Sequence, residues 1–468
     1  MNLSAIKGLI GFRNWVVLLC LLPGVACSTA NVHESKLDNG MKVVVKEDHR
    51  APVVVSQVWY KVGASYEHEG ITGISHMLEH MMFKGTKKHG PGEFSRIIAE
   101  QGGRENAFTG TDYTAYFETL EKSRLPIAFE LEADRMRNLI LDPGEYAKEH
   151  QVVLEERRMR TDDQPHAKTR EHFMAVAYTN GPYRNPVIGW PADVANLTVE
   201  DLKAWYQRWY APNNATLVVV GDVRPKQVFR LARHWFANLK PSQIPPLKPR
   251  TEVEQLGERR LTVELPAKLP YMIMGYKVPV LASLPKERQW EAYALTVLAG
   301  ILDGGESARL STHLVRGSQI AAAAGAGYDL YDRLPTLFVF NGTPSQGHDL
   351  DQLEKALLDE IHQLQQDLAS PDELERVKTQ VTADAIYERD SMFYQAMQIG
   401  MLETAGLGWK YLDQYVERIR AVTAEQVREV ARKYLVSKHL TVARLHPLPI
   451  KEGQRPAAPV FSGGEHVR

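Results

Sequence analysis

A proline-rich run divides the sequence into two parts of similar length. PSQIPPLKPR, residues 241–250, carries four prolines in ten residues. A polar run of this kind favours a stiff, extended connector. On each side of it the pattern begins with β-branched strands and ends with a helix followed by a strand. The order of elements therefore predicts an α+β fold built from a duplicated unit.

The same pattern sets the expected boundaries. We expect an N-terminal domain at 31–240, a linker at 241–254, a C-terminal domain at 255–446 and a disordered tail at 447–468. Strands are expected at 41–47, 51–63, 215–223, 261–266, 271–279, 336–341 and 440–445, with a hairpin at 105–120. Helices are expected at 74–83, 91–103, 124–162, 198–210, 285–302, 306–316, 350–404 and 423–435.

The first thirty residues differ from the rest of the chain. Lys7 and Arg13 supply positive charge, and WVVLLCLLPGVAC at 15–27 follows as a short apolar stretch. Because this stretch is too short for a comfortable membrane span, residues 1–30 are interpreted as an export signal. We therefore expect a protein of the bacterial periplasm or cell envelope.

The end of this signal allows three interpretations. Cleavage after Ala26 or after Ala30 fits the small residues there. PGVAC also resembles a bacterial lipobox ending at Cys27, which would carry a lipid anchor, although Gly24 stands where that pattern prefers leucine. The third interpretation is an uncleaved anchor.

Composition excludes several classes of function. Cys20 and Cys27 are the only cysteines and both lie within residues 1–30, so the mature chain has no internal disulfide and no thiolate chemistry. The formal net charge is -1, and no long basic run is present, which argues against a nucleic-acid partner.

The stretch HMLEHMMFKGT, residues 76–86, places two histidines four residues apart. On a helix, His76 and His80 would project from one face, at a spacing that suits two ligands of a tetrahedral zinc ion. Glu79 lies near the same face and would reach a water beside the metal as a general base. One helical turn therefore offers two metal ligands and a base.

A third ligand distinguishes a metal site from a chance match. HxxEH would arise by chance in roughly a few per cent of chains of this length and histidine content. A catalytic zinc usually has three protein ligands. EYAKEHQVVLEERRMR at 145–160 offers Glu149 and Glu156, which lie seven residues apart and share one helix face. Taken alone, these carboxylates are more typical of a solvated helix.

Three segments together resemble one known family. HMLEHMMFKGT at 76–86, GGRENAFTGTDYTAY at 102–116 and EHQVVLEE at 149–156, in that order, resemble the M16 family of inverzincins. This family includes pitrilysin, insulin-degrading enzyme and the mitochondrial processing peptidase. APNNATLVVVGDV at 211–223 matches as well, and the resemblance runs from about 33 to 450. It implies two duplicated α/β-sandwich domains, each an antiparallel-rich sheet packed with helices.

The resemblance also implies an activity, that of a zinc-dependent endopeptidase of the HxxEH type. It assigns one Zn²⁺ per chain to three ligands and gives two glutamates separate roles. The implied ligands are His76, His80 and Glu156, the implied base is Glu79, and Glu149 is implied to support the ligands. Asn106 and Ala107 match the edge strand on which the family pairs the backbone of its peptide substrates.

The second half departs from the family pattern. The family often carries an arginine and, seven residues later, a tyrosine that bind substrate and stabilise the tetrahedral intermediate. Aligning GGESARLSTHLVRGSQIAAAAGAGYDLY at 304–331 puts Arg316 at the arginine position and Ala323 at the tyrosine position. Tyr328 and Tyr331 follow at the wrong spacing.

This departure bears on partners. A chain of this length matches half of an M16 enclosure, so the resemblance implies a homodimer or a heterodimer with a metal-free M16 homologue. The alternative function is a non-catalytic M16-like subunit with a structural or assembly role. Retention of all three implied ligands and of Glu79 favours the peptidase.

Overall fold

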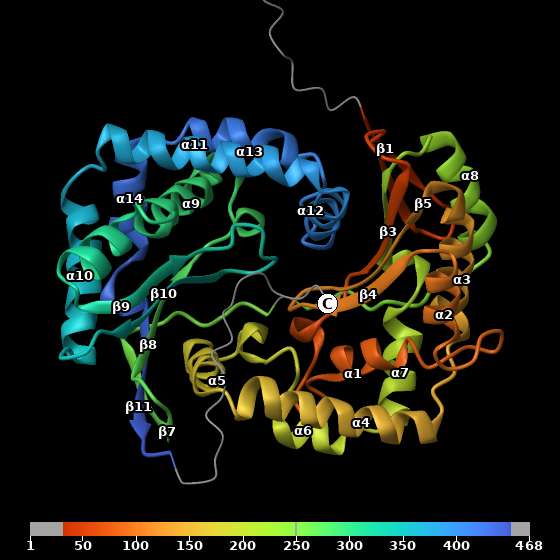
Figure 1. The fold of residues 1–468 in the computed structure, drawn as a ribbon, viewed down its shortest axis with the longest axis horizontal. Coiled ribbons are helices and arrows are strands. Elements are labelled where there is room, and N and C mark those ends of the chain that lie inside the picture. The colour runs from red at the N-terminus through yellow and green to blue at the C-terminus, as the bar shows by residue number, and fades with distance from the viewer. Residues whose placement is uncertain (1–30, 249, 451–468) are drawn as a thin grey trace, which may run out of the picture.

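The computed structural model describes residues 31–248 and 250–450, and its strands form two separate sheets (Figure 1). The first sheet contains β1 Val32–Lys36, β2 Lys42–Glu47, β3 Val53–Tyr60, β4 Arg104–Thr109, β5 Thr114–Glu121 and β6 Ala215–Gly221. The second contains β7 Arg259–Pro266, β8 Tyr271–Val278, β9 Ala321–Gly327, β10 Thr336–Pro344 and β11 Leu440–Leu448.

The second sheet repeats the topology of the first. The strand orders are β1-β2-β6-β3-β5-β4 and β7-β11-β8-β10-β9. Only β2 with β6 and β7 with β11 run parallel, and the remaining pairs are antiparallel. Without β1, each strand of the first sheet has a counterpart in the second, which confirms the duplicated α+β fold.

Helices cover both sheets. The N-terminal half holds α1 Ile74–Met81, α2 Glu93–Glu100, α3 Leu125–Asn138, α4 Pro143–Arg157, α5 Pro165–Ala177, α6 Pro191–Asn196, α7 Val199–Trp209 and α8 Pro225–Phe236. The C-terminal half holds α9 Trp290–Asp303, α10 Leu350–Gln366, α11 Pro371–Tyr387, α12 Met392–Thr404, α13 Tyr411–Arg420 and α14 Ala424–Tyr434. Each half has its own large apolar core between its sheet and its helices.

The two halves exchange one helix each. α12, from the C-terminal half, packs on β3 and β6 of the first sheet, where a separate apolar cluster forms. α5, from the N-terminal half, packs on β7, β8 and β11 of the second sheet. Figure 1 shows α12 beside the first sheet and α5 beside β8 and β11 of the second. The open face of each sheet is therefore buried by the other half.

Several elements differ from the sequence expectations. The helix expected at 124–162 is divided at 139–142, where Leu139 forms a bridge with Thr86. The region 350–404 forms three helices, and 306–316 contains a π-helical segment, Leu310–Gly317. β11 continues to Leu448, because its residues beyond 446 still pair with β7, so the expected tail begins too early. Several elements were not expected, namely β1, β9, α5, α6, α8 and α13.

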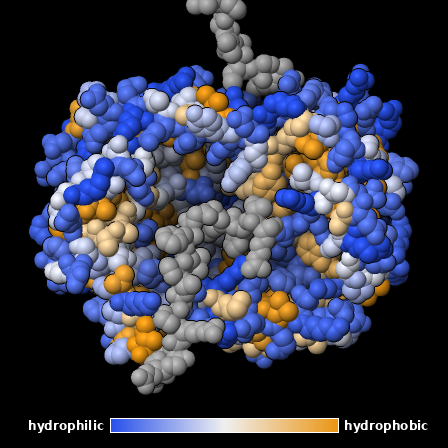
Figure 2. Space-filling model, viewed as in Figure 1, coloured by the Kyte–Doolittle hydropathy of each residue, from blue (hydrophilic) through white to orange (hydrophobic). Residues whose placement is uncertain are grey.

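The connector and the surface complete the fold. Among the described residues of 241–258 there is neither helix nor strand. No helix in the described ranges has the length and apolar character needed to cross a membrane. On the face shown in Figure 2, polar residues predominate over both halves and apolar residues gather in small groups. The expected signal at 1–30, including Cys27, lies outside the described residues.

Candidate metal centre

Two histidines of the expected site project from α1. The apolar residues of this helix are buried in the first core, which fixes its orientation. His76 and His80 lie one turn apart, with their ring centroids 4.9 Å from each other. The helical spacing predicted from the sequence therefore brings both imidazoles to one face, as the packing of the opposite face requires.

A buried carboxylate holds the start of α1. Glu67 accepts hydrogen bonds from the backbone N–H groups of Gly73 at 2.7 Å and Ser75 at 2.9 Å. Its side chain is fully buried, and this burial raises the pKa of Glu67 to about 7. Because the first N–H groups of a helix lack partners within the helix, these two bonds fix where α1 begins.

The third expected ligand comes from α4, which packs on α1. Asp142 caps this helix by accepting from the N–H groups of Gly144 and Glu145. Glu156 Oε2 lies 3.7 Å from His76 Nε2 and 3.4 Å from His80 Nε2. The structure therefore brings together three residues that are up to 80 positions apart in the chain.

The three donor groups fit a small tetrahedral metal ion. One ligand atom from each of His76, His80 and Glu156 can be chosen so that all lie within 4.8 Å of one another. Donors on a tetrahedral zinc ion would be about 3.3 Å apart, close to the two distances found here. Two imidazoles and one carboxylate are also a donor set that zinc accepts in catalytic sites.

Glu149 holds the second ring nitrogen of His80. His80 Nδ1 donates to Glu149 Oε2 at 3.1 Å, which leaves Nε2 directed toward Glu156. Lys84 Nζ lies 2.6 Å from the other oxygen of Glu149. A carboxylate in this position fixes the tautomer and orientation of a ligating histidine.

The cluster is strongly charged in the metal-free chain. Burial alone would lower the pKa of His80, but hydrogen bonds to Glu149 and Glu156 outweigh it and raise that pKa to about 9. For Glu156, burial is outweighed by the hydrogen bond from His80 and the charges of His76 and Arg160, which lower its pKa to about 2. The hydrogen bond from His80 lowers the pKa of Glu149.

Glu79 lies beside the cluster with a different environment. Its side chain is partly buried, and burial raises the pKa of Glu79 to about 7. Thr109 Oγ1, at the end of β4, donates a hydrogen bond to Glu79 Oε2. A carboxylate with a pKa near neutrality can both take and return a proton at physiological pH.

Strand β4 carries the expected substrate-pairing residues. It is the outermost strand of the first sheet and pairs only with β5 among the described strands. Asn106 and Ala107 lie in its middle, opposite Phe117 and Tyr116 of β5. β4 also contacts α1, so this edge strand runs past the candidate metal centre.

The second half contributes less than the resemblance implies. Arg316 is exposed, and its guanidinium donates to the backbone oxygen of Glu306 within its own segment. Ala323 is exposed on β9, the edge strand of the second sheet. Tyr328 donates its hydroxyl proton to Pro279 O at 2.8 Å. No contact described within this chain joins these residues to the cluster.

Sequence reasoning missed three residues that contact or support the site. Thr109 lies two positions after Ala107, so the alternation of a strand places both side chains on the same face of the sheet. This spacing is the signal that could have identified Thr109. Lys84 lies three residues beyond the end of α1, so helical spacing alone does not place it beside Glu149. Glu67 gave no signal, because its role depends on a loop that returns to the start of α1.

Two protein-family models match the chain. One, described as "Insulinase (Peptidase family M16)", matches residues 42–190. The other, described as "Peptidase M16 inactive domain", matches residues 196–381. The first covers all the residues of the candidate metal centre, and the second covers β7 to β10 of the second sheet.

Similar proteins cover nearly the whole chain. A Helicobacter pylori protein named zinc protease PqqE is 32% identical over 95% of this chain and 99% of its own. A Bacillus subtilis protein named uncharacterized zinc protease YmxG is 26% identical over 87% of this chain and 97% of its own.

Solved structures agree in fold. A protease from Helicobacter pylori superposes with a TM-score of 0.84 at 31% identity, over 89% of this chain and 99% of that chain. The periplasmic protease PqqL from Escherichia coli superposes with a TM-score of 0.75 at 17% identity, over 94% of this chain and 52% of that chain. On these matches, which confirm the resemblance read from the sequence, the chain is a two-domain member of the M16 peptidase family.

Proposed function

We propose that the chain is a zinc-dependent endopeptidase that cleaves peptides or unfolded segments. The observation that carries this proposal is the cluster of His76, His80 and Glu156, with Glu79 beside it. Relatives named zinc proteases support the same metal. One zinc ion per chain matches the one cluster of this kind found among the described residues.

The chain's own residues hold the ion and position it. His76 Nε2, His80 Nε2 and a Glu156 oxygen are the proposed ligands, and Glu149 keeps His80 in the tautomer that ligation needs. The chemistry supplied by a bound zinc ion is polarisation of the scissile carbonyl and acidification of water.

Glu79 is the proposed general base. Thr109 occupies Oε2, which leaves Oε1 to accept a proton from the attacking water. The same carboxyl then gives the proton to the nitrogen of the leaving amine as the peptide bond breaks. A pKa of about 7 suits both transfers, because neither protonation state is strongly disfavoured.

The proposed substrates are extended peptides. β4 is the edge strand of the first sheet among the described strands and lies beside the cluster, and a peptide can add there as a further strand through main-chain hydrogen bonds near Asn106 and Ala107. A compact folded protein holds most of its backbone N–H and C=O groups in internal hydrogen bonds, so unfolded segments fit this edge better.

A second candidate function is a non-catalytic M16-like subunit. Ala323 favours it, because the resemblance places a substrate-binding tyrosine at that position. Arg316, which points to its own segment, does not replace that group. Under the peptidase proposal, the chain would act as a homodimer or as a heterodimer with a metal-free homologue. Only a homologue could bring a tyrosine for this position, because a second copy also carries Ala323.

We also propose that the protein is exported to the periplasm or cell envelope, as a soluble form or a lipoprotein anchored at Cys27. Its support is the charged and apolar pattern of residues 1–30. Mass spectrometry of the mature N-terminus would distinguish cleavage after Ala26 or Ala30 from acylation of Cys27.

Hydrolysis of a mixed peptide pool by the purified mature chain tests the function. Glu79→Gln is the matched variant, and zinc content is measured in both proteins. Hydrolysis by the wild type that is lost in Glu79→Gln, with zinc retained, is the expected result. If both proteins bind zinc and neither cleaves, the chain is not a self-sufficient peptidase, and the result points to Ala323 and a missing partner subunit.

A further inference from the structure

A buried bridge joins the C-terminal half to the β4–β5 turn. Arg333, from the loop before β10, donates through Nε to Asp112 Oδ1 at 2.9 Å and through its backbone N–H to Oδ2 at 3.3 Å. The side chain of Asp112 is 8% exposed and that of Arg333 is 20% exposed. An ion pair at this depth is only weakly screened by solvent.

Asp112 has further partners around this bridge. Ser65 Oγ donates to Asp112 Oδ1 at 2.5 Å and accepts from Arg333 at 2.7 Å. The Tyr183 hydroxyl donates to Asp112 Oδ2 and accepts from the backbone N–H of Leu334 at 3.0 Å. Three segments distant in sequence therefore converge on one carboxylate at the tip of the hairpin.

The turn itself is bonded to the segment that leads into α1. Ser65 N–H donates to Thr111 O at 2.7 Å, and Ala64 N–H donates to Gly110 O. A Cβ on Gly63 would lie 2.4 Å from Gly110 O, so the two backbones are in direct contact. The position of the turn is therefore tied to Arg333 on one side and to the α1 segment on the other.

Thr109 transmits this position to Glu79. It is the last residue of β4, one residue before the turn, and its hydroxyl donates to Glu79 Oε2. A shift of the turn moves the Thr109 hydroxyl with it, since only Gly110 and Thr111 separate Thr109 from Asp112. The bond to Glu79 therefore depends on where the turn is held.

We infer that Arg333 is a positioning residue through which the C-terminal half orients Glu79, by way of Asp112 and Thr109. The inference rests on the proposed function, because it assumes that Glu79 acts on substrate. It gives the C-terminal half a direct part in the chemistry of the half that carries the candidate metal centre. Arg333 lies at the turn rather than at Asn106 and Ala107, so substrate pairing is left intact.

The test is steady-state kinetics on a fluorogenic peptide that the wild type cleaves, with zinc content and thermal unfolding measured alongside. Arg333→Met is expected to lower kcat about 10- to 100-fold with KM changed less than about threefold, as expected for a small misplacement of a catalytic group. Arg333→Lys, which keeps a charge for Asp112, is expected to recover part of this loss. Zinc content is expected to stay at the wild-type level.

A double-mutant cycle tests the route through Thr109. Thr109→Val is expected to lower kcat like Arg333→Met, and Thr109→Ser is expected to retain activity. The double variant Arg333→Met with Thr109→Val is expected to have a kcat within about threefold of that of the less active single variant. Both substitutions disturb the same bond to Glu79, so their effects should not multiply. Multiplying effects would overturn the inference.

Arg50→Met is the matched control. Arg50 also joins the two halves, through Asp390 at 2.9 Å, but it lies at the opposite end of β3 from the β4–β5 turn. Its removal is expected to leave kcat unchanged. If the wild type is active and Arg333→Met has the same kcat, the positioning role of Arg333 is wrong and the proposed function stands. If the wild type is inactive, both the proposed function and the role of Arg333 are overturned.

Discussion

The indole of Trp59 in β3 lies directly against the backbone of Gly400 in α12. A Cβ on Gly400 would stand 2.0 Å from Cε2 of the indole, closer than any real Cβ contact. Trp59 is fully buried in the apolar cluster that joins α12 to the first sheet. The absence of a side chain at position 400 is what lets the C-terminal half cover this sheet.

The reverse arrangement occurs at the equivalent place in the second sheet. Gly275 in β8 lies opposite Thr441 of β11, as Trp59 lies opposite Thr216 of β6. A Cβ on Gly275 would stand 2.7 Å from Cζ of Phe173 in α5. The large residue is on the strand in one interface and on the helix in the other, so the two exchanged helices are not interchangeable.

Gly400→Ala is expected to lower the free energy of unfolding by about 1–3 kcal/mol, because the methyl group must displace the indole of Trp59. At an unconstrained helix position the same change would stabilise the protein by roughly 1 kcal/mol. Denaturant unfolding followed by tryptophan fluorescence measures the difference.

Two variants make this result specific. Gly257→Ala, where a Cβ would meet no heavy atom within 4 Å, is expected to change stability by less than about 0.5 kcal/mol. Trp59→Leu makes room beside α12, so adding Gly400→Ala to it is expected to cost less than in the wild type. Equal costs in the two backgrounds would contradict the close contact.

The exchanged helices show where sequence patterns stop being informative about the fold. Alternation and helical periodicity predicted β2, β3, β6, β8 and α1, because each buries one face against its own neighbours. The same patterns did not predict α5, whose partner strands lie far downstream, from β7, which begins at Arg259, to β11, which begins at Leu440. β9, made of alanine and glycine, has no alternation to detect.

The residues of the candidate metal centre could be predicted from the sequence, whereas the hydrogen bonds that support them could not. His76, His80 and Glu79 are local on one helix, and Glu156 was found through a family resemblance. Thr109 meets Glu79 across 30 positions, and no local pattern reports that distance. Arg333 and Asp112 are 221 positions apart, so only the fold brings them together.

Glu149→Gln is expected to weaken zinc binding about 10- to 100-fold, because His80 loses the charged acceptor that orients its Nδ1–H. Chelator competition measures the affinity. Glu145→Gln, on the same helix but paired with Lys148, is the control and is expected to bind zinc as the wild type does. Equal affinities in both variants would show that Glu149 does not support the ligands.

Zinc binding is expected to displace a proton from His80 near neutral pH. Its pKa in the metal-free chain is raised to about 9, so the apparent zinc affinity should rise about tenfold per pH unit between roughly 7 and 9. Titration calorimetry in buffers of different ionisation enthalpy measures the released proton. Binding without proton release would mean that His80 is already neutral.

The same raised pKa makes a prediction for stability without metal. Protonated His80 stabilises the folded metal-free chain through Glu149 and Glu156. Because the folded pKa lies above the unfolded one, this contribution is fully present below about pH 6.5 and is lost as pH rises through about 9. Thermal unfolding of chelator-treated protein across this range is therefore expected to show a falling midpoint, and His80→Gln, which cannot titrate there, is expected to lose this component of the fall.

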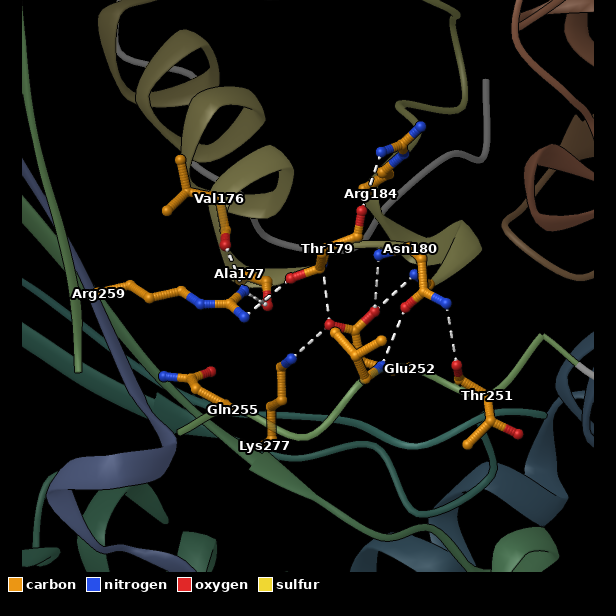
Figure 3. Close-up of polar contacts among 12 residues, drawn as sticks. Val176, Ala177, Thr179, Asn180, Arg184, Thr251, Glu252, Gln255, Arg259 and Lys277 are labelled. Atoms are coloured by element: carbon orange, nitrogen blue, oxygen red, sulfur yellow. Dashed lines mark hydrogen bonds and ion pairs between the residues drawn. The ribbon is translucent and has the colours of Figure 1, made fainter. Parts of the chain in front are cut away.

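Glu252 lies where the linker meets both halves, and its contribution to the free energy of unfolding is expected to depend on pH. Its carboxylate accepts from the backbone N–H groups of Thr179, Asn180 and Gly181 and pairs with Lys277 of β8 at 2.5 Å (Figure 3). Burial opposes ionisation, but the bond from Lys277 and those backbone groups outweigh it and lower the pKa of Glu252. The linker is therefore fastened to both halves at this point.

Glu252→Gln is expected to lower the free energy of unfolding by about 1–3 kcal/mol near pH 7. A carboxyl whose folded pKa is depressed stabilises the fold above its unfolded pKa of about 4.3, and this contribution is lost as pH falls through the folded value. The difference between wild type and variant should therefore shrink in acid. Glu254→Gln, in the same linker but 70% exposed and 3.7 Å from Lys438, is the control and should show no such difference. A Glu252→Gln deficit that stays constant from pH 7 to pH 3 would mean that the lost contacts depend on shape and not on the charge of the carboxylate.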